Sequence, residues 1–164
     1  GISQYYINTK HHNWKYDVLT DIYNTINIAQ CIIYINSKNI LNQVYQELNK
    51  DNFPVGIIHG SLMTSEREQI MNQFRQGEIR ILLSTDLLSR GIDIQQLSLV
   101  INYDLPIQKE TYIHRIGRSG RYGRKGVAIN FVTDRDLEYL HEIQTFYDTK
   151  IEEMPQNIGD IISA

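Results

Sequence analysis

Short apolar runs that alternate with amphipathic helical segments constrain the fold of this chain more than any other feature. Residues 31–35 form a continuous apolar run of strand length, a pattern typical of a buried parallel strand. The alternation predicts an α/β domain with a mostly parallel sheet and helices on both faces. Strands are predicted at residues 2–7 (a short edge strand), 55–58, 80–83, 99–103 and 127–132, and helices at 13–26, 38–48, 64–76, 109–116 and 134–147.

Capping residues and apolar spacing set the ends and buried faces of these helices. Ser37 is expected to cap the second helix, and Thr64 or Ser65 the third, which Gly77 should end. In the last helix, apolar residues recur at helical spacing. Its predicted buried side consists of Leu137, Leu140, Ile143, Phe146 and Tyr147.

Polar and small residues follow the predicted strands one after another. Because the carboxyl ends of parallel strands lie at one edge of a sheet, and such edges bind ligands, these residues predict a binding edge. The segments are Asn36-Ser37-Lys38, His59-Gly60, Ser84-Thr85-Asp86, Asp104 and Thr133-Asp134.

Length and charge restrict the class of protein. The 164 residues suffice for one domain, and the net charge is −3, yet residues 109–126 hold six basic side chains and one acid. An anionic partner must therefore meet a concentrated patch. The single cysteine, Cys31, permits no disulfide within the chain and fits a reducing compartment. No apolar run approaches the roughly 20 residues that span a bilayer, no signal peptide is visible, and a start at Gly1 suggests part of a longer protein.

An Arg-x-Gly unit occurs four times between Arg115 and Gly126. Arginine presents a planar fork of donors suited to phosphate, and glycine lets backbone N–H groups approach an anion. Four guanidiniums this close repel one another unless an anion lies among them, so the run predicts a polyphosphate or nucleic-acid site. From the run alone, a solvated basic turn or a localisation patch stays equally open. Four repeats are too few for collagen, and the flanking apolar segments argue against a disordered tail.

The loop after the strand at residues 80–83 carries a second group of polar residues. Thr85 is placed to donate to a phosphate oxygen, and Gly91 permits close backbone approach, although a helix cap at Ser84 or Thr85 is the simpler alternative. Asp93 would be repelled by phosphate, so its sensible nucleotide partner is a ribose hydroxyl. An ion pair with a nearby arginine is the alternative for Asp93.

The sequence contains no Gly-x-x-x-x-Gly-Lys-Ser/Thr segment. The chain therefore cannot hold a triphosphate and magnesium in the usual way, but its arginines can act as fingers on a nucleotide held by another domain. His114 has no Cys or His partner that would suggest a metal, so we predict no metal site.

These motifs together resemble the DEAD-box RNA helicases. His114-Arg115-Ile116-Gly117-Arg118-Ser119-Gly120-Arg121 looks like motif VI of that family, and Ser84-Thr85-Asp86 with Arg90-Gly91-Ile92-Asp93 looks like motif V. Residues 33–38 resemble motif IV, and Phe74-Arg75-Gln76-Gly77 resembles the segment after it. Residues 100–106 and 152–155 are similar to the initiation factor 4A branch in particular. The resemblance covers residues 1–164 as the second, C-terminal RecA-like domain, a three-layer P-loop NTPase-type fold, with the N-terminal P-loop domain absent from this chain.

The resemblance implies a role for each matching residue. Arg118 and Arg121 would be arginine fingers at the γ-phosphate of ATP, with His114 helping to couple the sites. Asp93 would contact the ribose, and Gly91 would also lie in the nucleotide site. The implied contacts to the sugars and phosphates of single-stranded RNA are Asn36, Lys38, Gly60, Arg67, Thr85 and Gly91.

The resemblance also implies cofactors, partners and a cellular role. ATP with Mg²⁺ would be held mainly by the N-terminal domain, and this chain alone would be inactive. The expected partners are RNA, the protein's own N-terminal RecA-like domain and a HEAT-repeat initiation scaffold. The protein is expected to be a cytoplasmic monomer that binds no membrane. A docking module without ATPase activity, a DNA-directed ATPase, and a nuclear paralogue in splicing-linked complexes or a paralogue in ribosome assembly remain alternatives.

Three positions depart from the family pattern. Ser37-Lys38 stands where the family often has Thr-Arg, which reduces a bidentate phosphate contact to a point charge. Thr64 stands where a glutamine is frequent, and Ser89 replaces a usual alanine. These departures bear on the strength of individual RNA contacts.

Overall fold

A seven-stranded sheet forms the centre of the computed structural model, which describes residues 2–25, 30–85, 97–117 and 126–156. The strand order is β3-β4-β2-β5-β6-β1-β7, and every pairing between these strands is parallel. The α/β fold with a parallel sheet is thus confirmed. The strands are β1 (Ile2–Asn8), β2 (Cys31–Tyr34), β3 (Val55–Ile58), β4 (Ile81–Ser84), β5 (Leu99–Asn102), β6 (Gly126–Val132) and β7 (Glu152–Glu153).

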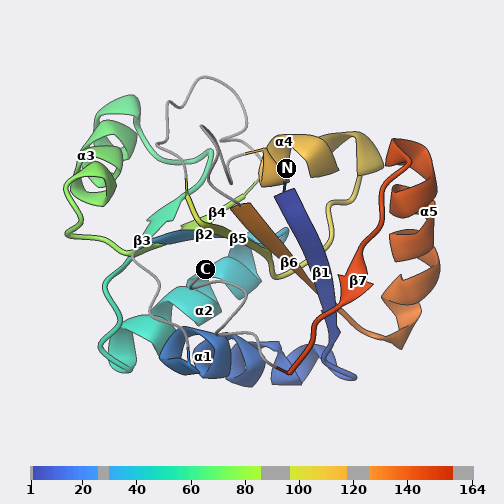
Figure 1. Cartoon of the computed structure of the whole chain (residues 1–164). Helices are drawn as coiled ribbons and strands as arrows, with labels where there is room; N and C mark the ends of the chain where they lie inside the picture. The colour runs from blue at the N-terminus through green and yellow to red at the C-terminus, as the bar shows by residue number, and fades with distance from the viewer. Residues whose placement is uncertain (1, 26–29, 86–96, 118–125, 157–164) are drawn as a thin grey trace.

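Helices cover both faces of the sheet (Figure 1). The first two helices lie against one face and the last three on the other side. They are α1 (Lys15–Thr25), α2 (Lys38–Lys50), α3 (Thr64–Arg75), α4 (Tyr112–Ile116) and α5 (Leu137–Tyr147). Short 3-10 turns precede α1, α4 and α5, namely η1 (His12–Trp14), η3 (Lys109–Thr111) and η4 (Asp134–Asp136).

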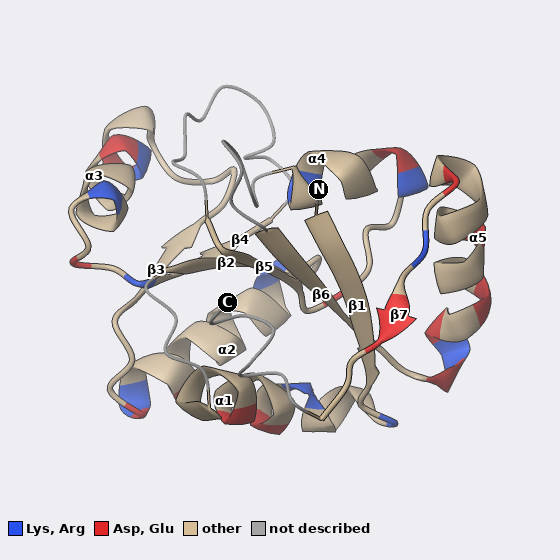
Figure 2. Cartoon of the chain, viewed as in Figure 1, with Lys and Arg blue, Asp and Glu red and all other residues tan. Residues whose placement is uncertain are grey.

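The central strands are apolar on both faces, as a parallel sheet between two helical layers requires. In β2, Cys31 and Ile33 pack in the cluster that holds α1 and α2, whereas Ile32 and Tyr34 pack in the cluster that holds α3. A third cluster joins α4 and α5 to β6. Figure 2 shows the consequence, since β2, β4, β5 and β6 carry no charged residue, whereas the charged residues lie on helices, on loops and on the short strand β7.

Two of the three predicted helix boundaries are confirmed and one is wrong. Ser37 caps α2, with its side chain accepting a hydrogen bond from the backbone N–H of Ile40, and Gly77 adopts a φ of +82° just beyond α3. The N-cap of α3, however, is Met63, because the Glu66 side chain accepts from the Met63 N–H at 3.2 Å. Thr64 is already the first helical residue.

Two further expectations are corrected by the packing. β1 is not an edge strand, because it pairs with β6 along its whole length and with β7 on its other side. On α5, Leu140 and Ile143 are buried as predicted, but Leu137 and Phe146 are exposed. The helix meets the domain on one side only, so the apolar stripe is wider than the surface that it covers.

Candidate functional site

The carboxyl ends of four neighbouring strands lie in register at one edge of the sheet. Tyr34 of β2 is paired with Ser84 of β4 and with Asn102 of β5, and Ser84 is paired with Ile58 of β3. The polar loops that follow these strands therefore lie side by side. This confirms that the polar loops gather at one edge of the sheet, while binding at that edge stays a prediction.

One part of this edge joins the loops after β2 and β3. Lys38 donates from Nζ to the Ser61 hydroxyl at 3.0 Å, and the Ser61 N–H donates to Nδ1 of His59 at 3.1 Å. Burial lowers the pKa of His59, and the Lys38 charge lowers it further. The imidazole is thus kept as an acceptor, and Lys38, the first residue of α2, contacts the loop that carries the exposed Gly60.

Two buried polar atoms beside these loops have no hydrogen-bond partner within the described part of the chain. They are the Thr85 hydroxyl, just after β4, and Nε of Arg67, on α3. Buried polar groups are nearly always paired, so each such atom requires an explanation. Both belong to residues for which the sequence predicts contacts to a phosphate backbone.

Arg115, the first arginine of the Arg-x-Gly run, points into the protein and not toward an anion. It is fully buried, and its guanidinium lies 5.2 Å from the centre of the Tyr34 ring. Its Nη1 donates to Oδ1 of Asn102 at 3.1 Å and to the Asp104 carbonyl at 2.7 Å. The expectation of four guanidiniums around one anion is therefore corrected, because this one is held by protein acceptors. Its neighbour His114 is exposed.

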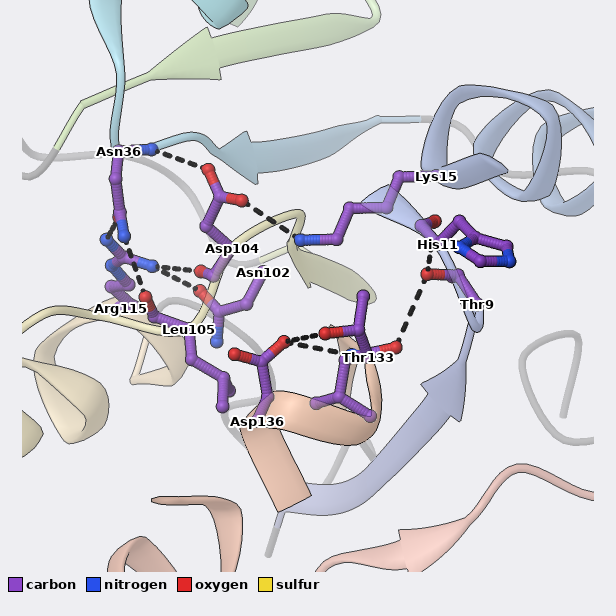
Figure 3. Close-up of polar contacts among 11 residues, drawn as sticks. Thr9, His11, Lys15, Asn36, Asn102, Asp104, Leu105, Arg115, Thr133 and Asp136 are labelled. Carbon is purple, nitrogen blue, oxygen red and sulfur yellow. Dashed lines mark hydrogen bonds and ion pairs between the residues drawn. The ribbon is translucent and has the colours of Figure 1, made fainter. Parts of the chain in front are cut away.

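Asn36 lies at the same edge, and both ends of its side chain are occupied. Its Oδ1 accepts from Nη2 of Arg115 at 2.6 Å, and its Nδ2 donates to the Leu105 carbonyl at 2.8 Å (Figure 3). The RNA contact expected from Asn36 remains a prediction, because the backbone N–H of Asn36 also has a partner, Oδ2 of Asp104 at 3.0 Å.

Sequence reasoning missed the ion pair between Lys15 and Asp104. The Lys15 Nζ lies 3.0 Å from Oδ1 of Asp104, and the two side chains are 5% and 17% exposed. A lysine in the first turn of an amphipathic helix looks like a surface residue in sequence, and no spacing rule links it to an aspartate so far along the chain.

A buried chain of amides and hydroxyls continues from Arg115 across the sheet. Asn102 donates to Asn130 at 2.8 Å, Asn130 donates to the Tyr112 hydroxyl at 3.2 Å, and Tyr112 donates to Gln4 at 2.8 Å. Burial raises the pKa of Tyr112. The chain ties β5, β6 and β1 to α4, the helix that leads to Arg118.

For the remaining predicted site residues, only their position in the sequence next to described residues is known. Gly91, Asp93, Arg118 and Arg121 lie outside the described residues. α4 ends at Ile116, and the N–H of its C-cap, Gly117, donates to the Ile113 carbonyl at 2.9 Å. In the sequence Arg118 comes directly after this cap, and the helix itself is anchored through Arg115. In the parts of the chain that the structure describes, no helix has the length and apolar character needed to span a membrane.

Comparisons with known proteins agree with this geometry. Residues 14–123 match the family described as the helicase conserved C-terminal domain. The chain is 56% identical over 162 residues to eukaryotic initiation factor 4A of Drosophila melanogaster, which covers 99% of this chain and 40% of that protein. The chain thus spans less than half the length of this relative.

Solved structures give the same result for the fold. The C-terminal domain of the DEAD-box protein Dbp5 is 40% identical, with a TM-score of 0.88 and coverage of 99% of this chain and 97% of that one. S. cerevisiae Dbp5 bound to RNA and ADP BeF3 has a TM-score of 0.91 at 40% identity, with coverage of 99% of this chain and 44% of that one.

Proposed function

Since this chain belongs to the helicase conserved C-terminal domain family, in its DEAD-box branch, we propose that it is the second RecA-like domain of an ATP-dependent RNA helicase acting in translation initiation. The observation that carries the proposal is the pair of unpartnered buried polar atoms, on Thr85 and Arg67, at the carboxyl edge of the sheet. A phosphate backbone supplies the acceptors that these donors lack.

The RNA-binding part of the proposal rests on the loops after β2, β3 and β4. Lys38 supplies a positive charge, and Gly60 leaves room for a sugar–phosphate chain to approach. Thr85 and Arg67 donate to phosphate oxygens, and the Asn36 carbonyl accepts from a ribose hydroxyl, since the Asn36 N–H is held by Asp104. Contacts of this kind bind RNA without reading its bases, which suits an enzyme that acts on many sequences.

The nucleotide part of the proposal rests on α4 and on the residues that follow it. Arg118 and Arg121 stabilise the charge that develops on the γ-phosphate, and His114 couples this site to RNA. Asp93 contacts the ribose beside Gly91. ATP with Mg²⁺ is held mainly by an N-terminal domain, and an arginine finger of this kind accelerates phosphoryl transfer by about 10³- to 10⁵-fold.

The two parts work together when two domains close on ATP and RNA. Closure brings the arginines to the phosphate and bends the bound strand, which disrupts a short duplex, and release of phosphate reopens the domains. In this proposal residues 1–164 form one domain, and an N-terminal domain completes the enzyme. The enzyme is a cytoplasmic monomer, and a HEAT-repeat scaffold of the initiation machinery binds it.

The test is the ATPase activity of this chain fused to the N-terminal part of Drosophila initiation factor 4A. We expect turnover that single-stranded RNA stimulates and that single-stranded DNA of the same sequence does not. Arg118→Ala and Arg121→Ala should each lower the stimulated turnover by about 10³-fold or more while ATP binding survives. The matched control is Arg80→Ala, an exposed arginine at the opposite end of β4, which should leave turnover unchanged.

Other outcomes would redirect the assignment. Near-normal turnover in both finger variants would overturn their assigned role. Equal stimulation by DNA would indicate a DNA-directed ATPase. A folded fusion that binds RNA without turnover would indicate a docking module, and the unfused chain should show no ATPase.

A further inference from the structure

Asp104 is the point at which three distant segments of the chain meet (Figure 3). Its Oδ1 accepts from Lys15 Nζ of α1 at 3.0 Å, and its Oδ2 accepts from the backbone N–H of Asn36, in the loop after β2, at 3.0 Å. Its carbonyl accepts from Arg115 Nη1 of α4 at 2.7 Å. A single residue in the loop that follows β5 thus holds α1, α4 and a candidate RNA-binding loop together.

A further hydrogen bond closes these contacts into a ring. Arg115 reaches past Asp104 and donates from Nη2 to Oδ1 of Asn36 at 2.6 Å. Asn36 is two residues before Lys38, and Arg115 is three residues before Arg118. The ring therefore joins the loop assigned to RNA and the helix that leads to the arginine fingers.

We infer that Lys15 is a positioning residue for this ring, and that by neutralising the Asp104 carboxylate it keeps the Arg115 fork on Asn36. The inference rests on the proposed function, because the reaction that depends on the ring is RNA-stimulated ATP hydrolysis. Lys15 itself touches neither RNA nor nucleotide. It acts through Asp104, from a helix outside the motifs of the candidate site.

The physical reason is the cost of an uncompensated buried charge. The Lys15 and Asp104 side chains are 5% and 17% exposed, so each charge depends on the other for stabilisation that water would otherwise give. Without Lys15, the Asp104 carboxylate would attract the guanidinium of Arg115, which already donates to the backbone carbonyl of Asp104. Rotation of the Arg115 side chain toward the carboxylate would take Nη2 away from Asn36 and shift α4 relative to the loop after β2.

A second ion pair, at the same carboxyl edge of the sheet, provides a matched control. Lys10 follows β1 as Asp134 follows β6, and their charged atoms lie 3.8 Å apart. Their side chains are 61% and 72% exposed, so water and salt screen the pair and its loss should have little effect. The two pairs join the same residue types but differ in burial and in the distance between the charged atoms.

The test uses the fusion described above, with Lys15→Met, Lys15→Arg, Lys15→Met/Asp104→Asn and Lys10→Met. A misplacement near 1 Å costs up to about 100-fold in rate, so we expect Lys15→Met to lower the RNA-stimulated kcat about tenfold or more. Binding of ATP and the KM for ATP should stay near wild type. The conservative Lys15→Arg should recover most of the kcat.

The double variant separates positioning from simple loss of stability. Asp104→Asn keeps a side-chain acceptor for the Asn36 N–H but removes the charge that would attract Arg115, so kcat should return to within about threefold of wild type. Lys10→Met should match wild type throughout. Thermal unfolding of every variant defines an assay temperature at which all of them are folded. If Lys15→Met does not fold, Lys15→Gln replaces it, and we expect its kcat to fall as well.

The outcomes distinguish this inference from the proposed function. Absence of RNA-stimulated turnover in the wild-type fusion would refute the proposed function. Normal wild-type turnover together with an unchanged kcat in folded Lys15→Met, or in Lys15→Gln where that variant takes its place, would refute the inference alone. A loss that neither Lys15→Arg nor the double variant restores would also refute it, because neutralisation of Asp104 would then not be the cause.

Discussion

The carboxyl edge of the sheet contains two regions that differ in whether their buried polar groups have hydrogen-bond partners. Around Asp104, Arg115 and Asn36, buried donors meet acceptors within the protein. Around Thr85 and Arg67, two buried polar atoms have no partner in the described part of the chain. The first region is held together by its own hydrogen bonds, and the second is where we propose that RNA binds. The comparison also separates Arg115, which donates to acceptors within the protein, from Arg118 and Arg121, for which we propose contacts to the nucleotide.

The largest effect should come from breaking the paired region. Arg115→Ala leaves the buried acceptors of Asn36, Asn102 and Asp104 without their donor, and removal of one member of a buried charged network costs about 3–5 kcal/mol. We expect the urea midpoint of the isolated domain to fall accordingly. Arg75→Ala, an exposed arginine at the end of α3, should change the unfolding free energy by less than about 1 kcal/mol. Equal effects of the two changes would contradict the structural role of Arg115.

The opposite effect on stability is expected in the unpaired region. Thr85→Val removes a hydroxyl that has no partner and keeps the shape of the side chain, so the unfolding free energy should stay the same or rise by up to about 1 kcal/mol. Affinity of the fusion for single-stranded RNA should fall several-fold, as measured by fluorescence anisotropy with the ATP analogue ADP BeF3. A variant that is both less stable and unchanged in RNA affinity would assign Thr85 to the fold and end the contrast.

The smallest effect concerns His59, whose pKa is lowered by burial and by Lys38. Because the folded pKa lies below the unfolded value, the contribution of His59 to stability is present above that unfolded value and is lost as pH falls through the folded pKa. The NMR titration midpoint of His59 should lie below 6.5, and it should rise in Lys38→Met. Bound RNA should raise it as well, because nearby phosphates favour the imidazolium. A midpoint that RNA leaves unchanged would place the phosphates elsewhere.

Local patterns predicted the architecture because each depends on residues that are close in sequence. The apolar run of β2, the cap at Ser37 and the stop at Gly77 are properties of a few neighbouring residues, and the structure confirms all three. The polar segments after the strands were also visible, because a parallel sheet places them at one edge whatever their partners are.

Sequence patterns could not supply partners that are distant in the chain. Arg115 belongs to a regular Arg-x-Gly run, yet it is buried because strand register brings Asn102, Asp104 and Asn36 within reach of one guanidinium. The position of β1 inside the sheet, one strand from its edge, likewise depends on two partners far along the chain, β6 and β7.

The sequence by itself determined a parallel α/β domain, the edge at which its polar loops gather and, through its motifs, the family to which it belongs. Only the tertiary structure decided which charges serve the fold. Lys15 and Asp104 are 89 positions apart, and their pairing is a consequence of how α1 packs beside the end of β5. Burial of a charge depends on the packing of whole elements, whereas the periodicity that forms those elements is local.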